Sequence, residues 1–290
     1  MLGREESNIY ILEGSKESVI ISGGLCVIVP EVLRQLKEFN INIASIKKLV
    51  ILHSHFDHVG VVPYFKRTLV PGIELLGSAR TWDLLSQDKA LATINLFNKM
   101  TISRMNNSSG ISIEDCQWAG DIKGSVLREG DEIDVGGLTL TVIETPGHSS
   151  CSISLYCPQL KALFPSDGVG IPFRGNIMPA GNSNFTLYQS NLERMKSYDA
   201  NYVCADHYGY VSGDEAAGYM KDSIEAAARF RRHMEGVYEK KGNINETVRY
   251  LVAASLKAYP EYFLPKEILE GIYRQMVRHI AEKLEEQGCR

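Results

Sequence analysis

The segment HSHFDHVG, residues 53–60, concentrates side chains that bind metal ions. It holds three histidines and one aspartate, and it directly follows an apolar run that is typical of a buried strand. In extended backbone, alternate side chains point to one side, so His53 and His55 are placed to share one ion. Asp57 and His58 are adjacent and face apart unless the backbone turns, an offset that suits a second ion. The spacing therefore predicts a metal site, in preference to a polar loop that is rich in histidine by chance.

Further candidate ligands stand where later strands are expected to end. These ligands are His148, Asp167 and His207, and an apolar run precedes each of them. Side chains borne on the ends of several strands converge at one edge of a sheet, where the active sites of α/β proteins commonly lie. We therefore expect these three residues to join the cluster in residues 53–60.

Strands and helices alternate through the first third of the chain, which indicates an α/β protein. The patterns predict strands at 7–13, 17–21, 46–52 and 73–77, and helices at 30–39 and 59–69. Residues 81–107 interrupt this rhythm as one long helical insertion with a broad apolar face, ended by residues 106–110. We expect the insertion to pack on the domain, with a cover over a pocket as the alternative.

The last part of the chain has helical periodicity throughout. Residues 212–215 match a capping box, and the pattern that follows runs to Lys241. Two further helices are expected at 245–258 and from 265 to about 287. The sequence thus predicts a catalytic domain at 1–211 and an all-helical subdomain at 212–290.

Composition narrows the class of protein. The 290 residues carry a net charge of −4, with 44% hydrophobic and 23% charged residues, which fits a globular protein and argues against a nucleic-acid partner. The start of the chain lacks the apolar core of a signal peptide, and no run approaches transmembrane length. The six cysteines are scattered: Cys26, Cys116, Cys151, Cys157, Cys204 and Cys289. We expect reduced thiols and a cytoplasmic protein that has no membrane partner.

Taken in order, the candidate ligands resemble those of the metallo-β-lactamase superfamily. The matching motifs are HxHxDH as HSHFDH, a GH motif as TPGHSSCS, an aspartate in FPSDG and a last histidine in ADHYG. Their order and separations fit from about residue 7 to 211. The resemblance implies an α/β (α+β) fold, the four-layer αββα sandwich, with a two-metal site at one edge. The chain begins close to the second strand of the family pattern, so a first edge strand is interpreted as either missing or trimmed from the sequence.

The resemblance also implies a ligand set for two divalent ions. The ligands implied for the first ion are His53, His55 and His148. Those implied for the second ion are Asp57, His58 and His207. Asp167 would bridge the two. Nitrogen and oxygen ligands suit Zn²⁺, with iron or manganese as alternatives.

Within the superfamily, the helical tail is similar to the glyoxalase II and acyl-thioesterase branch, where C-terminal helices shape the substrate pocket. It is also similar to the thioesterase of a quinolone-signalling pathway. The best-known β-lactamases carry a cysteine at the position of Asp167, and flavodiiron proteins carry a glutamate at that of His55, which argues against both activities. Cys151 stands where the family usually has a glycine, and we interpret it as a packing thiol.

The implied chemistry is hydrolysis by a hydroxide that bridges two metal ions, one of which also polarises the acyl carbonyl. The sequence offers no clearly placed general acid, and a thiolate leaving group needs little protonation because free thiols have a pKa of about 8.5. We therefore predict a dinuclear metal-dependent hydrolase of a small-molecule thioester or related activated acyl compound. Asp57 and Tyr208 are the expected catalytic side chains. Tyr208 would assist the oxyanion or the leaving group, with a packed aromatic as the alternative.

Other functions remain open on the same residues. They are phosphodiester cleavage, lactone opening, a persulfide dioxygenase that uses one iron, and a regulatory effector that works through a partner without catalysis. Net acidity and the lack of a basic arm weigh against nucleic acid as substrate.

The remaining basic residues of the tail suggest little chemistry. We expect His233 and His279 to be exposed or capping residues. Arg229, Arg231 and Arg232 form a basic cluster with His233, interpreted as a solvated helix face, with contact to an anionic group such as a CoA phosphate as the alternative. The helical segments would form either a lid or the contact of a homodimer.

Overall fold

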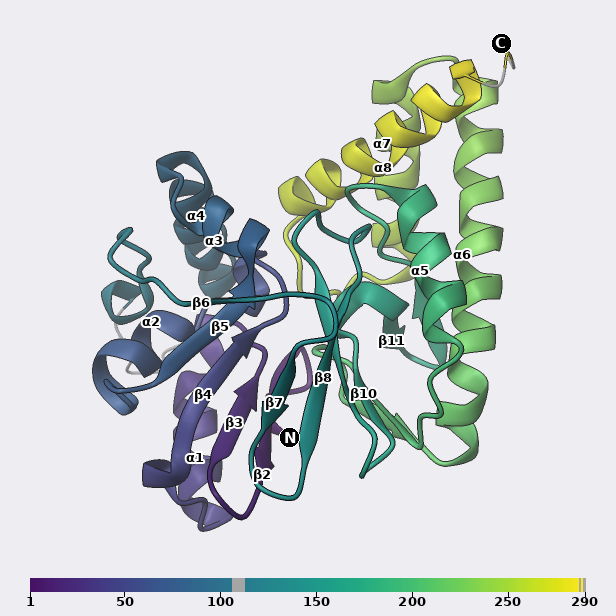
Figure 1. The fold of residues 1–290 in the computed structure, drawn as a ribbon. Coiled ribbons are helices and arrows are strands. Elements are labelled where there is room, and N and C mark those ends of the chain that lie inside the picture. The colour runs from purple at the N-terminus through teal and green to yellow at the C-terminus, as the bar shows by residue number, and fades with distance from the viewer. Residues whose placement is uncertain (106–112, 287, 289–290) are drawn as a thin grey trace.

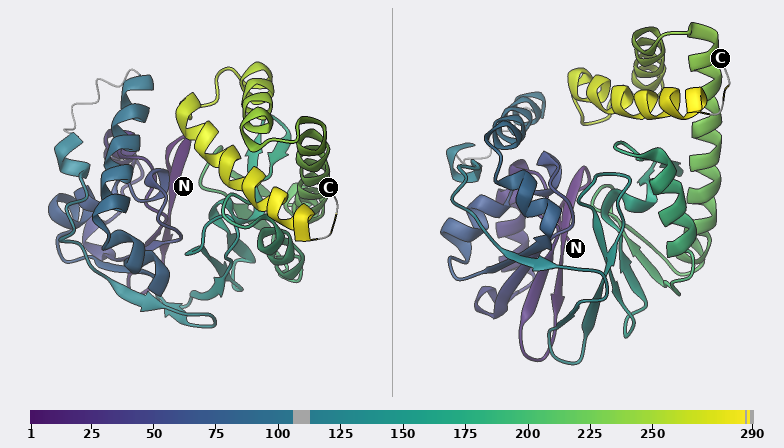
Figure 2. Two further views of the ribbon diagram at one scale, coloured as in Figure 1. Left: turned by 90° about the horizontal axis from the view of Figure 1, so that it is seen from above. Right: turned by 45° about the horizontal axis from the view of Figure 1, so that its top comes forward.

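The computed structural model describes residues 1–105, 113–286 and 288, and its elements form four layers (Figure 1). Two six-stranded sheets pack face to face, and helices cover both outer faces (Figure 2). This arrangement confirms the αββα sandwich that the sequence predicts. A two-stranded ribbon and three C-terminal helices stand beside the second sheet.

The first sheet contains the N-terminal strands in chain order, β1 (Leu2–Arg4), β2 (Ser7–Glu13), β3 (Ser18–Ile21), β4 (Ile46–Ile51), β5 (Glu74–Ser78) and β6 (Ser125–Leu127). Strands β3 to β6 run parallel. The prediction of an absent edge strand is wrong, because β1 pairs antiparallel with β2 and forms that edge.

The second sheet, in spatial order, contains β14 (Tyr210–Ser212), β13 (Tyr202–Cys204), β10 (Ala162–Phe164), β9 (Ile153–Cys157), β8 (Thr139–Glu144) and β7 (Glu132–Asp134). Its pairs are antiparallel except β10 with β13. The ribbon pairs β11 (Ile171–Phe173) with β12 (Asn176–Met178).

Alternation along the strands explains why both faces of a sheet are buried. In β3, Val19 and Ile21 belong to the core between the two sheets, whereas Ile20 belongs to the core under the outer helices. Strand β4 repeats the pattern, with Val50 facing inward and Leu49 outward. Successive side chains of a strand point to opposite faces, so a continuous apolar run fits a sheet that is covered on both sides.

The helices are α1 (Val29–Glu38), α2 (Val62–Tyr64) with a π-turn (Phe65–Leu69), α3 (Ala79–Leu85), α4 (Asp88–Arg104), α5 (Phe185–Met195), α6 (Asp214–Lys241), α7 (Ile244–Ala258) and α8 (Lys266–Glu286). The single helix predicted for 81–107 is wrong, because α3 ends before Ser86 and α4 begins after Gln87. The expected helix end at 106–110 lies outside the described residues.

The tail helices α6 to α8 share a core with the second sheet. Val203 and Val211 of the sheet pack in one apolar cluster with Met234 of α6 and Ile280 of α8. The helix α6 ends at Gly242 in a left-handed conformation, which glycine adopts without steric cost. Its N-cap is Gly213, without a side-chain cap bond, so the predicted capping box is not formed. The division into two domains stays a prediction.

The two histidines of the helical tail differ in exposure. His279 is 8% exposed, so the prediction of an exposed or capping residue is wrong there, whereas His233 is exposed as expected. No helix in the described parts of the chain is both long enough and apolar enough to cross a bilayer.

Candidate metal centre

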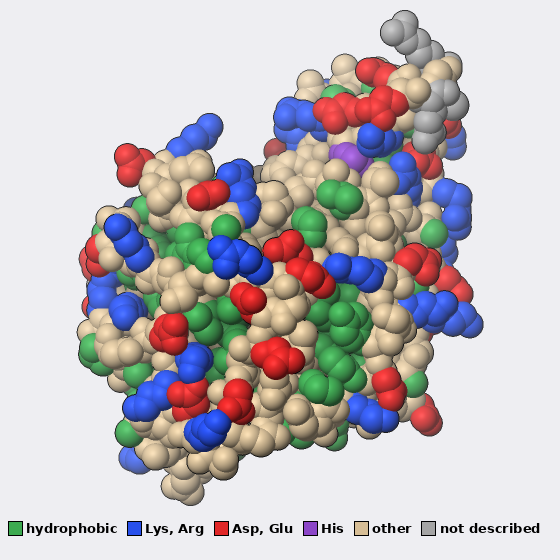
Figure 3. All heavy atoms as spheres, in the orientation of Figure 1, with side chains coloured by type: hydrophobic (Ala, Val, Ile, Leu, Met, Phe, Trp, Pro, Cys, Tyr) green, Lys and Arg blue, Asp and Glu red, His purple; other side chains and the backbone are tan. Residues whose placement is uncertain are grey.

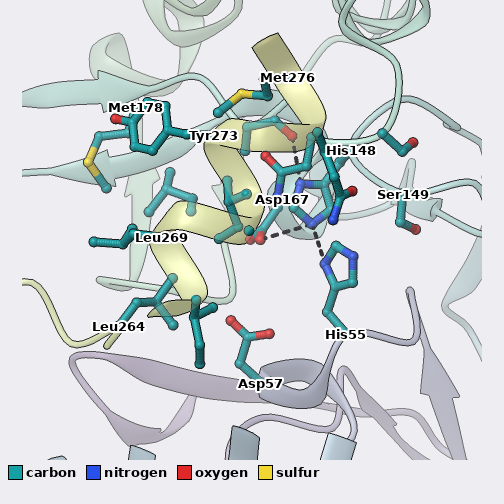
Figure 4. Close-up of a pocket in the computed structure, with 18 of the residues that line it drawn as sticks. His55, Asp57, His148, Ser149, Asp167, Met178, Leu264, Leu269, Tyr273 and Met276 are labelled. Atoms are coloured by element: carbon teal, nitrogen blue, oxygen red, sulfur yellow. Dashed lines mark hydrogen bonds and ion pairs between the residues drawn. The ribbon is translucent and has the colours of Figure 1, made fainter. Parts of the chain in front are cut away.

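The candidate ligands come from four loops that follow strands and meet at one edge of the sandwich. The loop after β4 carries the HxHxDH segment, and the loops after β8, β10 and β13 bring the other three ligands. Figure 4 shows His55, Asp57, His148 and Asp167 directed toward a common space. The structure thus brings together all seven side chains that the sequence predicts: His53, His55, Asp57, His58, His148, Asp167 and His207.

The first group surrounds His148. Its Nε2 lies 3.1 Å from Nε2 of His53 and 2.9 Å from Nδ1 of His55. Three nitrogens at these distances are close enough to bind one ion.

The second group surrounds His58, whose Nε2 lies 3.1 Å from Nε2 of His207 and 3.8 Å from Oδ2 of Asp57. A 3₁₀ turn over residues 56–58 brings Asp57 and His58 to the same side, because the N–H of His58 donates to the carbonyl of His55. The backbone turn that the sequence left open is therefore present.

Asp167 connects the two groups. Its Oδ2 lies 3.3 Å from Nε2 of His148 and 3.3 Å from Nε2 of His58. Its Oδ1 is buried and accepts no hydrogen bond within the described residues. A buried carboxylate oxygen without a donor is a ligand suited to a cation.

The charge states fit metal binding. Burial lowers the pKa of His55 and of His148 to about 4, so both rings are neutral at pH 7. Burial would raise the pKa of Asp167, but the imidazoles of His58 and His207 hold it well below its usual range. Burial opposes a proton on His58, yet the carboxylates of Asp167 and Asp57 raise its pKa well above the ordinary value. Neutral imidazoles and ionised carboxylates are the forms that bind metals, and a cation that binds His58 would displace its proton, so the residues fit one or more ions.

Ligand orientation is set by residues that sequence reasoning did not assign. Nδ1 of His148 donates to the carbonyl of Ala180 at 2.6 Å, and Nδ1 of His207 donates to that of Glu6 at 2.6 Å. Each bond leaves the lone pair of Nε2 free to face the cluster. Backbone acceptors carry no sequence signal, because any residue type can supply a carbonyl.

A third ligating histidine, His58, is oriented by a side-chain acceptor, the carboxylate of Asp206, which accepts several hydrogen bonds. Its Oδ2 accepts from Nδ1 of His58 at 2.8 Å, from Oγ of Ser22 at 2.7 Å and from Oγ of Ser166 at 2.5 Å. Ser22 and Ser166 have positive φ values of 71° and 51°, which are uncommon for residues other than glycine. Backbone strain of this kind gathers at functional sites. The signal available in the sequence was the position of Asp206 beside His207.

Tyr208 and Cys151 are not among the clustered candidate ligands. Tyr208 packs against Phe173, with ring centres 4.5 Å apart, and is not among the described side chains that line the cavity beside the ligands. This placement favours the packed aromatic that the sequence left as an alternative, and the catalytic role stays a prediction. Cys151 is buried, and its sulfur accepts from the N–H of Ser54 at 3.4 Å.

A cavity of about 910 Å³ opens beside the ligands. Its lining residues come from helices α3 and α4, from the tail helices α6, α7 and α8, and from the ribbon β11–β12. Asp57, His148, Asp167 and His207 form part of its wall. Its volume lies within the roughly 300–1,000 Å³ that is usual for small-molecule sites. The helical tail therefore completes a pocket over the candidate metal centre.

The αββα sandwich and a histidine–aspartate cluster at the strand ends define a class of metal-binding proteins. Residues 2–207 match the family model of the metallo-beta-lactamase superfamily, and the chain belongs to this superfamily. The human protein named acyl-coenzyme A thioesterase MBLAC2 is 30% identical over 174 residues, 56% of this chain and 58% of its own length.

Two other relatives extend the comparison. The hydroxyacylglutathione hydrolase of Brucella anthropi is 29% identical over 118 residues, 36% of this chain and 42% of its own. A crystal structure of a metallo-beta-lactamase family protein from Thermus thermophilus has a TM-score of 0.67 at 18% identity, covering 97% of this chain and 89% of the other. That likeness concerns the fold and extends over the helical tail.

Proposed function

We propose that the chain is a metal-dependent hydrolase that cleaves an acyl thioester. The observation that carries this proposal is the large cavity that opens onto the clustered histidines and aspartates. The relatives named as a thioesterase and as a hydroxyacylglutathione hydrolase support it. The whole activity remains a proposal, since these matches cover little more than half of either chain at most.

The chain's own residues divide the work. His53, His55 and His148 would hold one ion, and Asp57, His58 and His207 a second, with Asp167 shared between them. Bound ions of this kind supply an activated water and polarise a carbonyl. The acceptors on Nδ1 of His58, His148 and His207 fix the ring orientations before any ligand arrives.

The leaving group favours a thioester over an amide. An amine must be protonated as it leaves, whereas a thiolate leaves near neutral pH because its pKa is about 8.5. The side chains that hold the ions would therefore suffice without a dedicated acid. The face in Figure 3 shows Lys and Arg interspersed with Asp and Glu, and no continuous basic stripe crosses this face. That distribution and the net charge of −4 weigh against a nucleic-acid phosphodiester as substrate.

The test combines elemental analysis with a panel of acyl-CoA and acyl-glutathione thioesters on the same protein sample. We expect about two metal ions per chain and turnover that is lost on chelation and restored by Zn²⁺. Hydrolysis that persists in stripped protein would contradict the proposal. One iron per chain, with O₂ consumed on glutathione persulfide and no hydrolysis, would favour the dioxygenase instead.

A further inference from the structure

One face of α8 is apolar where it borders the cavity. Ile268, Leu269, Ile272 and Met276 lie at the helical spacing that places side chains on one face, and all four line the cavity. Leu269 and Met276 are only 5% and 2% exposed, so most of each side chain packs against protein and a small part borders the cavity. Figure 4 shows Leu264, Leu269 and Met178 gathered on one side of the space, with His55 and His148 on the other.

Helix α4 also contributes apolar side chains to the lining of the cavity. Ile94 and Phe97 of α4 line the cavity, and Phe56 of the ligand loop packs against Phe97, with ring centres 5.5 Å apart. The cationic residues that line the cavity, Lys89 and Arg229, are exposed. An apolar interior beside a charged rim suits a ligand with an apolar end and a charged end.

Gly271 interrupts the lining of α8. Glycine in a helix interior costs roughly 1 kcal/mol relative to alanine. Gly271 lines the cavity, and a Cβ added to it would meet open space. Gly271 is itself exposed, so a larger side chain here would stand at the open side of the cavity. Gly236 of α6 has equally open surroundings but does not line the cavity.

We infer that the cavity is the binding site of an extended, apolar acyl chain, and that Gly271 determines how long a chain it admits. The inference deepens the proposed function and rests on it for the identity of the reacting bond. The acyl chain would lie along α8 between Leu269 and Met276, and the charged end of the thiol would lie toward Lys89 and Arg229.

Binding can be measured without catalysis. The probes are S-alkyl-CoA thioethers from butyl to hexadecyl, which have no thioester to hydrolyse, titrated calorimetrically into the metal-loaded full chain. We expect the affinity to rise by up to about fourfold per methylene until the cavity is filled. In Gly271→Phe the rise should stop at a shorter chain, with about tenfold weaker binding of the dodecyl thioether than in the control Gly236→Phe.

The outcomes separate the two proposals. If affinity in the unmodified protein is independent of chain length, the acyl site is overturned, even when a short-chain thioester is hydrolysed. If affinity follows chain length but no thioester is hydrolysed with Zn²⁺ present, the proposed function fails and the acyl site stands. Equal series for Gly271→Phe and Gly236→Phe would overturn the role of Gly271. If Gly271→Phe does not fold, Gly271→Leu takes its place.

Discussion

Asp206 and His58 form a buried pair in which Oδ2 of the carboxylate lies 2.8 Å from Nδ1 of the ring. The two residues are 148 positions apart in the chain, and both are at most 1% exposed. Ser22 and Ser166 donate to the same oxygen, so the carboxylate is held from three sides. Since Nδ1 of His58 is engaged, Nε2 is the atom that faces Asp57, Asp167 and His207. The pair therefore sets the ring for metal binding.

Removing this charge should weaken metal binding while the fold remains. We expect Asp206→Asn to lower Zn²⁺ affinity by about 10- to 100-fold, the usual effect of losing an acceptor behind a ligating histidine. The measurement is competition with a chelator of known affinity. Asp199→Asn is the matched control, because Asp199 is an exposed carboxylate that pairs with Lys161. Equal affinities for the two variants would contradict the positioning role.

Asp167 should matter more than any single imidazole because it lies between both groups. We expect Asp167→Asn to lose at least one bound ion per chain and to lower kcat about 100-fold or more, since the ions contribute several kcal/mol to the transition state. Elemental analysis and turnover on one thioester are the two readouts. The control is Asp134→Asn, which removes an exposed carboxylate paired with Lys16. Full metal content in Asp167→Asn would rule out a shared ligand.

The sequence predicted the positions of the candidate ligands because they obey a local rule. His148, Asp167 and His207 each follow an apolar strand, and strand ends meet at one edge of a sandwich. Asp206 and Ser166 followed the same strands, but nothing in their residue types marked them as partners of a histidine. Their hydrogen bonds join residues 40 to 184 positions apart, so no local spacing records them.

Helix boundaries were less predictable for a similar reason. The apolar pattern of 81–107 continues across the break at Ser86 and Gln87, although Gln87 has an extended backbone that separates α3 from α4. Periodicity reports which residues are buried, and it does not report where one helix axis ends and another begins. The capping box before α6 matched by sequence alone, whereas the structure has Gly213 at that cap.

The basic residues at 229–233 of α6 differ in what they contact. Arg229 and His233 line the cavity, and Arg229 also lies 3.6 Å from Glu225. Arg231 instead donates to Glu235 at 2.8 Å and to Gln189 at 2.9 Å. We expect Arg229→Gln to raise KM for an acyl-CoA about two- to fivefold, the usual value of an exposed charge pair, and to reduce its dependence on salt. KM for the N-acetylcysteamine thioester of the same acyl group should be unchanged, because that thiol carries no phosphate. The control is Arg232→Gln, an exposed position that does not line the cavity.

His279 should make the packing of the tail depend on pH. Its Nε2 accepts from the N–H of Thr186 at 3.3 Å and lies 3.0 Å from its hydroxyl, which joins α8 to α5. Burial lowers the pKa of His279, Arg231 and Lys283 lower it further, and Glu282 and Glu286 act in the opposite direction. The ring therefore binds a proton less readily in the folded chain than in the unfolded chain, where the pKa is about 6.5.

The sign of the effect follows from that difference. The unfolded state binds more protons below about pH 6.5, so this contribution to stability is complete above pH 6.5 and is lost as the pH falls through the folded pKa. His279→Gln keeps an acceptor for Thr186 but does not titrate. We expect the wild-type melting temperature to fall more than that of His279→Gln between pH 7.5 and 5.5. The metal ligands titrate equally in both proteins, so only the difference reports His279, and parallel curves would show that it does not contribute.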